Sequence, residues 1–183
     1  MAVTDHTDED VMNTPERQRQ ISALVEAHYA ELYRFAFRLS GSRSDAEDIA
    51  QQAFMTAYEK LDQLRDPQFA RPWLFAIVRN AFLKTWRRSE RHRSLSIEEV
   101  GEPIDKSTDE IPELTGEELT ALLGELPDEF RIPLVLFYFE DMSYREIAES
   151  LEVPVGTIMS RLSRGKTYLR QRLTEQIPAV STK

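Results

Sequence analysis

Two predicted helices joined by a tight turn, residues 143–173, constrain the fold of this chain more than any other stretch. Ser143 and Glu146 stand three residues apart, as in a capping box, and this pattern fixes where the first helix begins. The apolar period continues to Leu151 and then stops. Pro154 cannot continue a helix but is well placed to open the next one. The sequence therefore predicts a helix-turn-helix.

The second predicted helix, residues 154–173, has one apolar and one polar face. The inward positions of its helical wheel are Val155, Ile158, Leu162, Gly165, Leu169 and Leu173. The outward positions are Gly156, Ser160, Ser163, Arg164, Thr167 and Gln171. The segment holds five Arg or Lys residues and no Asp or Glu. A slim cationic helix suits a DNA major groove. A helical hairpin with a solvated basic face fits the periodicity equally well, so the rest of the chain must decide.

The composition excludes several classes of function. A chain of 183 residues with 41% hydrophobic content can bury a core and is long enough for two small domains. It has no cysteine, and its 3 histidines lack ligand spacing, so we expect no metal site, no cofactor and no catalytic residue. No apolar run can span a bilayer and no leader stands at the N-terminus, which predicts a cytoplasmic protein without membrane insertion.

The formal net charge of -9 argues at first against a nucleic-acid partner. Basic residues, however, are concentrated in two segments. Residues 65–93 hold eight Arg or Lys against two acidic residues, and residues 154–173 are the second basic segment. Between them, residues 96–129 hold twelve acidic residues and one lysine. The charge pattern indicates two basic surfaces separated by an acidic tether.

Hydrophobic periodicity predicts an all-α fold of two small helical domains, the second ending in the helix-turn-helix. The segments between and outside them are polar and lack periodicity, which is typical of disordered or flexible chain. The predicted order is a tail (1–15), a first domain (16–93), a flexible acidic linker (94–114), a second domain (115–175) and a tail (176–183).

Capping and stop signals place the first two helices. The first, residues 17–39, ends at Gly41. Ser44 and Glu47 form another predicted capping box, which opens a helix over residues 44–64. The inward stripe of this second helix is Ile49, Ala53, Phe54, Ala57, Tyr58 and Leu61.

The first turn of the second helix is acidic. Asp45, Glu47 and Asp48 lie where the helix dipole favours negative charge, which is a sufficient structural explanation for them. Gln51 and Gln52 extend the same surface. The alternative is an acidic and polar patch presented to a basic partner protein, and spacing alone does not decide between the two.

The third helix, which Pro72 starts, is both aromatic and basic. Single-stranded DNA requires charge for its backbone and rings for its unstacked bases. Trp73 and Trp86, considered singly, fit core packing equally well. Asn80 offers both a hydrogen-bond donor and an acceptor. The cationic residues of this helix that need solvent or phosphate are Arg79, Lys84, Arg87 and Arg88.

Three motifs in order carry a family resemblance. Asp-Ala-Glu-Asp followed by Gln and an aromatic-rich helix is matched by residues 45–58, and Trp-Leu-x-x-Ile-x-Arg-Asn with trailing arginines by residues 73–88. Leu-Pro, Ser-Tyr-x-Glu-Ile-Ala and Val-Pro-Val-Gly-Thr with Ser-Arg-Leu are matched by residues 126–162. Over residues 20–173 the chain resembles a bacterial sigma factor of the sigma-70 family, in its extracytoplasmic-function (ECF) branch.

The resemblance implies a subunit that binds core RNA polymerase, brings it to promoter DNA and helps to melt that DNA. It implies an anti-sigma factor as a further partner, and an acidic linker that threads the RNA-exit region of the polymerase. The implied polymerase-binding residues are Asp45, Glu47, Asp48, Gln51 and Gln52. The implied minus-10 residues are Asn80, Lys84, Arg87 and Arg88, with the loop 65–71. The implied minus-35 residues are Thr157, Ser160, Arg161, Arg164 and Lys166.

Five positions depart from the family pattern. Gln52 stands where Glu is frequent and Lys84 where Asp is frequent, which bears on polymerase affinity and minus-10 preference. Phe137 and Met159 occupy positions where basic residues are common, and Ser163 replaces a frequent His or bulky residue. We expect a helix with fewer charges to grip phosphates less tightly and to read a different minus-35 sequence.

Two other functions compete with this interpretation. A stand-alone helix-turn-helix regulator would bind duplex DNA without polymerase, but it would need a sensor or dimerisation domain and would leave the basic aromatic helix unexplained. A carboxylate-dependent hydrolase is the enzymatic alternative. The sequence has no clustered His, no Cys and no Gly-rich phosphate loop, so we predict that the protein is not an enzyme.

Overall fold

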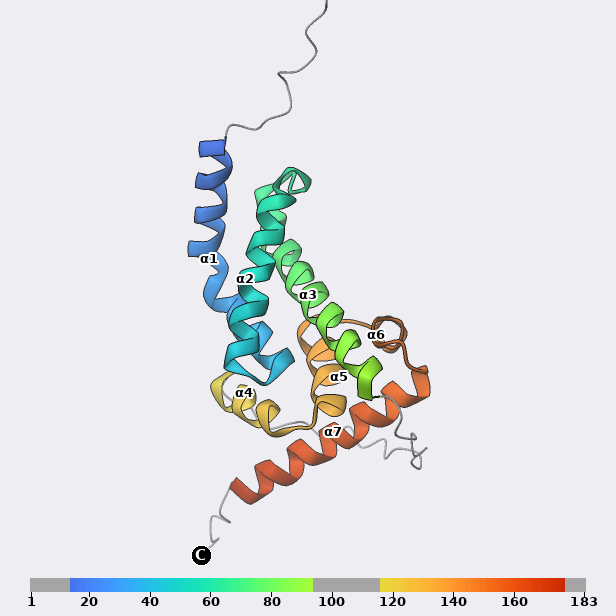
Figure 1. Ribbon diagram of the computed structural model, residues 1–183. Helices are drawn as coiled ribbons and strands as arrows, with labels where there is room; N and C mark the ends of the chain where they lie inside the picture. Colours follow the sequence, from blue (N-terminus) through green and yellow to red (C-terminus); the bar gives the residue numbers. More distant parts are fainter. Residues whose placement is uncertain (1–13, 94–115, 177–183) are drawn as a thin grey trace, which may run out of the picture.

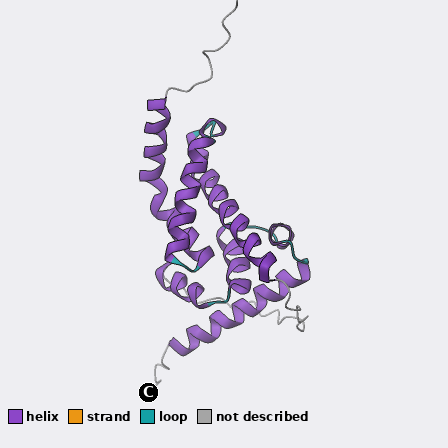
Figure 2. Cartoon of the chain, in the orientation of Figure 1, coloured by secondary structure: helices purple, strands orange, loops and turns teal. Residues whose placement is uncertain are grey.

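The computed structural model describes residues 14–93 and 116–176, and every regular element in these ranges is helical (Figure 2). The predicted all-α class is confirmed, and the helices form two groups along the chain (Figure 1). The predicted linker, 94–114, lies outside the described residues, as do 1–13 and 177–183 of the predicted tails. The elements are α1 (Thr14–Ser40), α2 (Arg43–Glu59), η1 (Leu61–Gln63), η2 (Pro67–Phe69), α3 (Ala70–Arg93), α4 (Gly116–Glu125), α5 (Asp128–Phe139), α6 (Tyr144–Leu151) and α7 (Val155–Gln176).

Helix α1 is longer than predicted, because it begins at Thr14, inside the stretch predicted as a tail. It ends where expected. Gly41 has a φ of 68°, a left-handed conformation that glycine adopts without a Cβ clash. The Gly41 N–H donates to the Phe37 carbonyl at 2.7 Å, which satisfies one of the last carbonyls of the helix.

The start of α2 differs from the prediction. Ser42 has extended backbone angles, and its hydroxyl accepts a hydrogen bond from the Asp45 N–H at 3.3 Å, so Ser42 is the N-cap. Ser44 lies inside the first helical turn, and the predicted capping box of Ser44 and Glu47 is therefore wrong. The physical reason is Gly41, which turns the chain directly before Ser42 and leaves Ser42 as the last extended residue.

The connection from α2 to α3 contains more structure than the sequence indicated. Helix α2 ends at Glu59, before the predicted residue 64, and the short 3-10 turns η1 and η2 follow. The Asp66 carboxylate caps η2 by accepting a hydrogen bond from the Gln68 N–H at 2.9 Å. Helix α3 then begins at Ala70 rather than at Pro72. The predicted inward stripe of α2 is buried except for Tyr58, which is exposed.

In the second group of helices, the helix-turn-helix is formed by α6 and α7, and α6 begins where the sequence predicted. The Ser143 hydroxyl accepts from the Glu146 N–H at 3.3 Å, and the Glu146 carboxylate accepts from the Ser143 N–H at 2.8 Å. The predicted capping box is thus confirmed. Glu152 ends α6 in a left-handed conformation, and α7 begins directly after Pro154.

The inward face of α7 is confirmed with one exception. Ile158, Leu162, Leu169 and Leu173 are buried, and Gly165 lies directly against α5. Val155 was predicted inward but is 38% exposed. As the first residue of the helix it lies at the α6–α7 turn, where it lines an open hollow and not the core.

The two helical groups pack against each other. Helix α1 contacts α5, and α3 contacts α6 (Figure 1). The buried apolar residues of both groups belong to one continuous cluster, in which Leu39 of α1 and Ile132 of α5 are fully buried. The position of each functional surface therefore depends on both groups.

Candidate nucleic-acid and polymerase interfaces

The outward face of α7 is the first candidate surface. Of the predicted minus-35 residues, Arg164 is exposed and Thr157 and Ser160 are half-buried at the N-terminal part of the helix. Gly156 has no heavy atom within 4 Å of a Cβ built on it, so the backbone itself is open to close approach there. Small residues and one exposed arginine leave room for a duplex to approach this end of α7.

Arg161 and Lys166 are placed differently. The Arg161 side chain is only 17% exposed, and its Nε lies 3.9 Å from the Glu129 carboxylate of α5. Lys166 is half-buried. The structure therefore does not bring the five predicted minus-35 residues to one equally open surface. Met159, at a position where the family often has a basic residue, is 44% exposed on this helix.

The second candidate surface is the polar face of α3. Asn80, Lys84 and Arg88 are exposed, and together with Leu83 and Arg87 they line a shallow hollow of about 450 Å³. The four predicted minus-10 residues are thus brought together on one helix face. Three long cationic side chains around an open hollow suit a phosphate backbone.

Arg87 is engaged with the second helical group. Its Nε donates to the Ser150 carbonyl at 2.8 Å, and its guanidinium lies 3.6 Å from the Glu152 carboxylate. The neighbouring Arg79 pairs in the same way with Glu140 at 3.2 Å. These two arginines point from α3 toward α5 and α6 rather than into solvent.

The tryptophans of α3 favour core packing over stacking with bases. Trp73 and Trp86 are half-buried and pack against the apolar cluster. The Trp86 Nε1–H is buried and has no hydrogen-bond partner among the described residues. The exposed ring is instead Phe69, which is 63% exposed at the end of η2. Phe69 lies in the loop 65–71 that the family resemblance implied for the minus-10 element, although its ring was not singled out there for stacking with bases.

The third candidate surface lies on α2. Asp45, Glu47, Asp48, Gln51 and Gln52 are all exposed, while Ala46, Ile49 and Ala50 of the same helix are buried. Two further residues continue this surface and were missed by sequence reasoning, which placed Tyr58 on the inward face and gave Met55 no role. Met55 is 60% exposed and Tyr58 is 36% exposed. Exposed large apolar side chains bordered by acidic ones are typical of a protein-binding surface.

Among the described residues, no group of three or more His, Cys, Asp or Glu could hold a metal ion. No helix there is long and apolar enough to cross a bilayer.

Comparison with known proteins gives two family matches. Residues 24–92 match the family described as Sigma-70 region 2, and residues 116–169 match Sigma-70, region 4. The first match contains α2 and all of α3 except its last residue, and the second contains α6 and most of α7, which form the helix-turn-helix.

Named relatives agree with these matches. ECF RNA polymerase sigma factor SigW of Bacillus subtilis is 30% identical over 170 residues, which are 86% of this chain and 91% of the relative. SigL of Mycobacterium tuberculosis is 34% identical over 157 residues, 84% of this chain and 88% of the relative. SigE of Mycolicibacterium smegmatis is 37% identical over 160 residues; the match covers 83% of this chain and 61% of that longer relative.

Among solved structures, the sigma factor RpoE of Bartonella quintana, in complex with the anti-sigma factor NepR, is similar with a TM-score of 0.48. The two chains are 25% identical, and the similarity covers 88% of this chain and 99% of the other. The sequence relatives and both family matches are sufficient to assign the family. The chain belongs to the extracytoplasmic-function RNA polymerase sigma factors of the sigma-70 family.

Proposed function

We propose that this chain initiates transcription by binding core RNA polymerase, directing it to promoters and helping to melt the promoter DNA. The observation that supports this most strongly is the presence of two cationic surfaces, on α3 and α7, in one chain that matches both sigma regions. Each surface has few charges and would bind DNA weakly by itself. If the polymerase holds both surfaces against one DNA template, their simultaneous contacts would give an affinity that neither surface has alone. The protein would act by binding, without a cofactor or chemistry of its own.

Within this function, α7 would read the minus-35 duplex. Arg164 is the residue best exposed to reach a base edge, and Thr157 and Ser160 would add hydrogen bonds near the start of the helix. Arg161, half-buried beside Glu129, would fix the position of α7 on α5 and meet at most a phosphate. Lys166 would contact the backbone.

The face of α3 would bind the melted minus-10 strand. Asn80, Lys84 and Arg88 line the hollow described above, and Arg87 would join them when it leaves Ser150. Phe69, exposed beside this helix on η2, would supply the ring on which an unstacked base can lie. This assignment places base stacking on the loop 65–71 and not on the tryptophans.

The α2 surface would bind the polymerase. Its acidic and amide residues, Asp45, Glu47, Asp48, Gln51 and Gln52, give a polar rim around the apolar Met55.

The remaining assignments follow the family. The domains would be residues 16–93 and 115–175, connected by an acidic linker at 94–114, and the protein would act in the cytoplasm under control of an anti-sigma factor.

In vitro transcription with purified core polymerase on a promoter library tests this function. Initiation at defined sites only when the chain is added is the expected result. Arg164→Ala should reduce initiation mainly at promoters that depend on their upstream element, while Arg19→Ala, an exposed arginine on α1, should leave all promoters unchanged. Equal loss at every template would contradict the role of Arg164. Tight binding of the free chain to its duplex target would favour a stand-alone regulator instead.

A further inference from the structure

The first two turns of α7 expose an apolar strip. Val155 is 38% exposed and Met159 is 44% exposed. They stand four residues apart, so their side chains lie on the same side of the helix. Gly156 between them is also exposed, and a Cβ built on it would meet no heavy atom of the described residues within 4 Å. We call Val155, Gly156 and Met159 the apolar stripe of α7.

The apolar stripe is unsuited to contact with phosphates. Phosphate contacts come from cationic or hydrogen-bonding groups, whereas a valine side chain offers none and a methionine thioether is only a weak acceptor. The exposed cation of this helix, Arg164, follows further along it. The exposed surface of α7 is thus apolar near its start and cationic beyond.

The charge of the helix favours DNA over a protein as the partner of the stripe. Residues 154–173 hold five Arg or Lys and no acidic residue, so the helix that carries the stripe is attracted to phosphates. Two exposed apolar side chains are also few for a stable protein–protein interface, which takes roughly 20 residues or more on each side.

Within the stripe, Met159 is better placed than Val155. The hollow at the α6–α7 turn that Val155 lines is also lined by the acidic Glu149 and Glu152, which are unfavourable next to phosphates. Met159 lies one helical turn beyond Val155, on the way to Arg164. The stripe therefore offers one long apolar side chain to the DNA, that of Met159.

The major groove presents one protruding apolar group, the C5-methyl of thymine, among hydrogen-bond donors and acceptors. Methionine is unbranched and flexible, so its side chain can adapt to contact such a group. Gly156 lets the backbone of α7 come close to the groove, because no side chain stands in between.

We propose that Met159 is a specificity-determining residue, which selects thymine in the minus-35 element by contact with its C5-methyl group. The inference rests on the minus-35 role proposed for α7, and it adds the base chemistry that this helix selects. Arg164 would supply hydrogen bonds and charge, and Met159 would supply the preference for a methyl group.

Deoxyuridine tests the contact, because it pairs like thymine and lacks only the C5-methyl group. The template is a promoter from the library that initiates with the wild-type chain and is weakened by Arg164→Ala. Thymines of its minus-35 element are replaced one at a time on either strand, and initiation is measured with subsaturating holoenzyme. It should fall about three- to four-fold at one position, as expected from one methyl group left unburied.

Two variants assign this effect to Met159. Met159→Leu keeps an apolar side chain, whereas Met159→Gln has nearly the same length and is polar. Met, Leu and Gln have similar helix propensities, so α7 itself should be equally stable in all three chains. Met159→Leu should keep at least about a two-fold preference for thymine over deoxyuridine, and Met159→Gln should initiate equally well on both templates.

Lys84→Ala, on the polar face of α3, is the control for a general loss of promoter strength. It should lower initiation on the thymine and deoxyuridine templates by the same factor and keep the wild-type ratio between them. A ratio that falls to one in Lys84→Ala would show that the ratio follows promoter strength and not Met159, which would overturn the proposal.

The remaining outcomes separate this inference from the proposed function. If the wild-type chain initiates at no member of the library, the proposed function fails. If it initiates, but no deoxyuridine template is weaker or the minus-35 element holds no thymine on either strand, the inference alone fails. It fails as well if Met159→Gln loses the same factor on both templates, because Met159 would then contact a protein and not the methyl group.

Discussion

Two glycines of the second helical group have opposite surroundings. A Cβ on Gly165 would lie 2.7 Å from Leu134 Cδ1 and 3.3 Å from Phe130 Cβ, both on α5, whereas a Cβ on Gly124 meets nothing within 4 Å. We expect Gly165→Val to lower the free energy of unfolding by about 2 kcal/mol through overpacking. Gly124→Ala should raise it by about 0.5 kcal/mol, since the helix loses a flexible residue. Urea denaturation of both variants measures the difference, and equal effects would contradict the close α5–α7 approach.

Glu140 gives a prediction for pH. Burial raises the pKa of the Glu140 carboxyl, and the attraction of Arg79 opposes this rise without cancelling it. The Glu140 carboxyl therefore binds its proton more strongly in the folded state than in the unfolded chain. This contribution to stability is complete below the pKa of the unfolded chain and is lost as pH rises through the higher pKa of the folded chain.

Glu140→Gln imitates the protonated form at every pH. We expect this variant to be at least as stable as the wild type at neutral pH and to lack the part of the pH dependence that Glu140 causes. Urea denaturation at several pH values, from below the ordinary Glu pKa to neutrality, checks both statements. A variant clearly less stable than the wild type at neutral pH would show that the ion pair with Arg79 outweighs the cost of burial.

At the scale of one element, the capping box of α6 is a direct test of what starts a helix. Ser143→Ala removes the hydroxyl that accepts from the Glu146 N–H and should cost about 1 kcal/mol of unfolding free energy. Hydrogen bonds from the Ser143 hydroxyl and N–H lower the pKa of Glu146. Their contribution is present above the unfolded pKa and is lost as pH falls through the folded one, so the variant should lose less stability in acid than the wild type.

Ser44→Ala, in the first turn of α2, is the control for the capping variant Ser143→Ala. Ser44 lies inside the first turn of α2 and does not cap it, so its replacement should change the unfolding free energy by less than about 0.5 kcal/mol. Ser42→Ala, at the observed cap, should behave like Ser143→Ala. A larger loss at Ser44 than at Ser42 in thermal denaturation would restore the capping box that the sequence alone predicted.

These caps also show how far sequence reasoning reaches. Ser143 was placed correctly because one Ser-x-x-Glu pattern stood before one apolar run. Before α2 two serines compete, and the backbone of Gly41 decides between them. The local pattern favours Ser44, because Glu47 stands three residues after it whereas Asp45 stands three residues after Ser42. That pattern takes no account of the turn that the backbone makes at Gly41.

The exposure of a candidate site residue could be predicted from the sequence, but its contacts with the other helical group could not. The exposed residues of α2, and Arg164 on α7, follow from helical periodicity, which fixes the face but not what covers it. The engagement of Arg87 with Ser150 and of Arg131 with Leu39 joins residues 63 and 92 positions apart. Such contacts depend on how the two helical groups meet, and no periodicity in either group records that.

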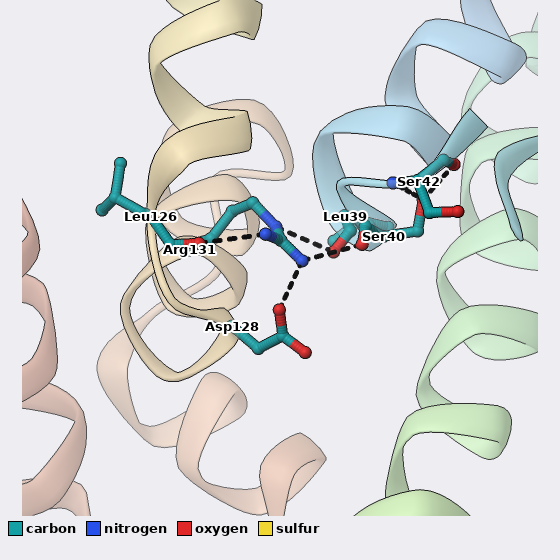
Figure 3. Close-up of polar contacts among 6 residues, drawn as sticks. All are labelled: Leu39, Ser40, Ser42, Leu126, Asp128 and Arg131. Carbon is teal, nitrogen blue, oxygen red and sulfur yellow. Dashed lines mark hydrogen bonds and ion pairs between the residues drawn. The ribbon is translucent and has the colours of Figure 1, made fainter.

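At the scale of the whole molecule, the net charge bears on binding to nucleic acid, and the shared core bears on how the two helical groups unfold. The net charge of -9 is unfavourable for indiscriminate binding of the free chain to nucleic acid. The continuous apolar cluster couples the two helical groups into one unit, and so do the hydrogen bonds that the buried Arg131 of α5 donates to the Leu39 and Ser40 carbonyls at the end of α1 (Figure 3). Coupled groups with a common core unfold together, whereas groups connected only by a tether unfold independently.

We therefore expect one calorimetric unfolding transition for the wild type, with equal calorimetric and van't Hoff enthalpies. Arg131→Met leaves the α1 carbonyls without their buried donor and should cost about 3 kcal/mol, most of it from the coupling between the groups. The transition should then separate into two. Asp62→Asn, which breaks the exposed pair with Arg17 inside the first group, should cost less than about 1 kcal/mol and keep one transition. Two transitions already in the wild type would contradict the coupling of the two groups through the shared core and Arg131.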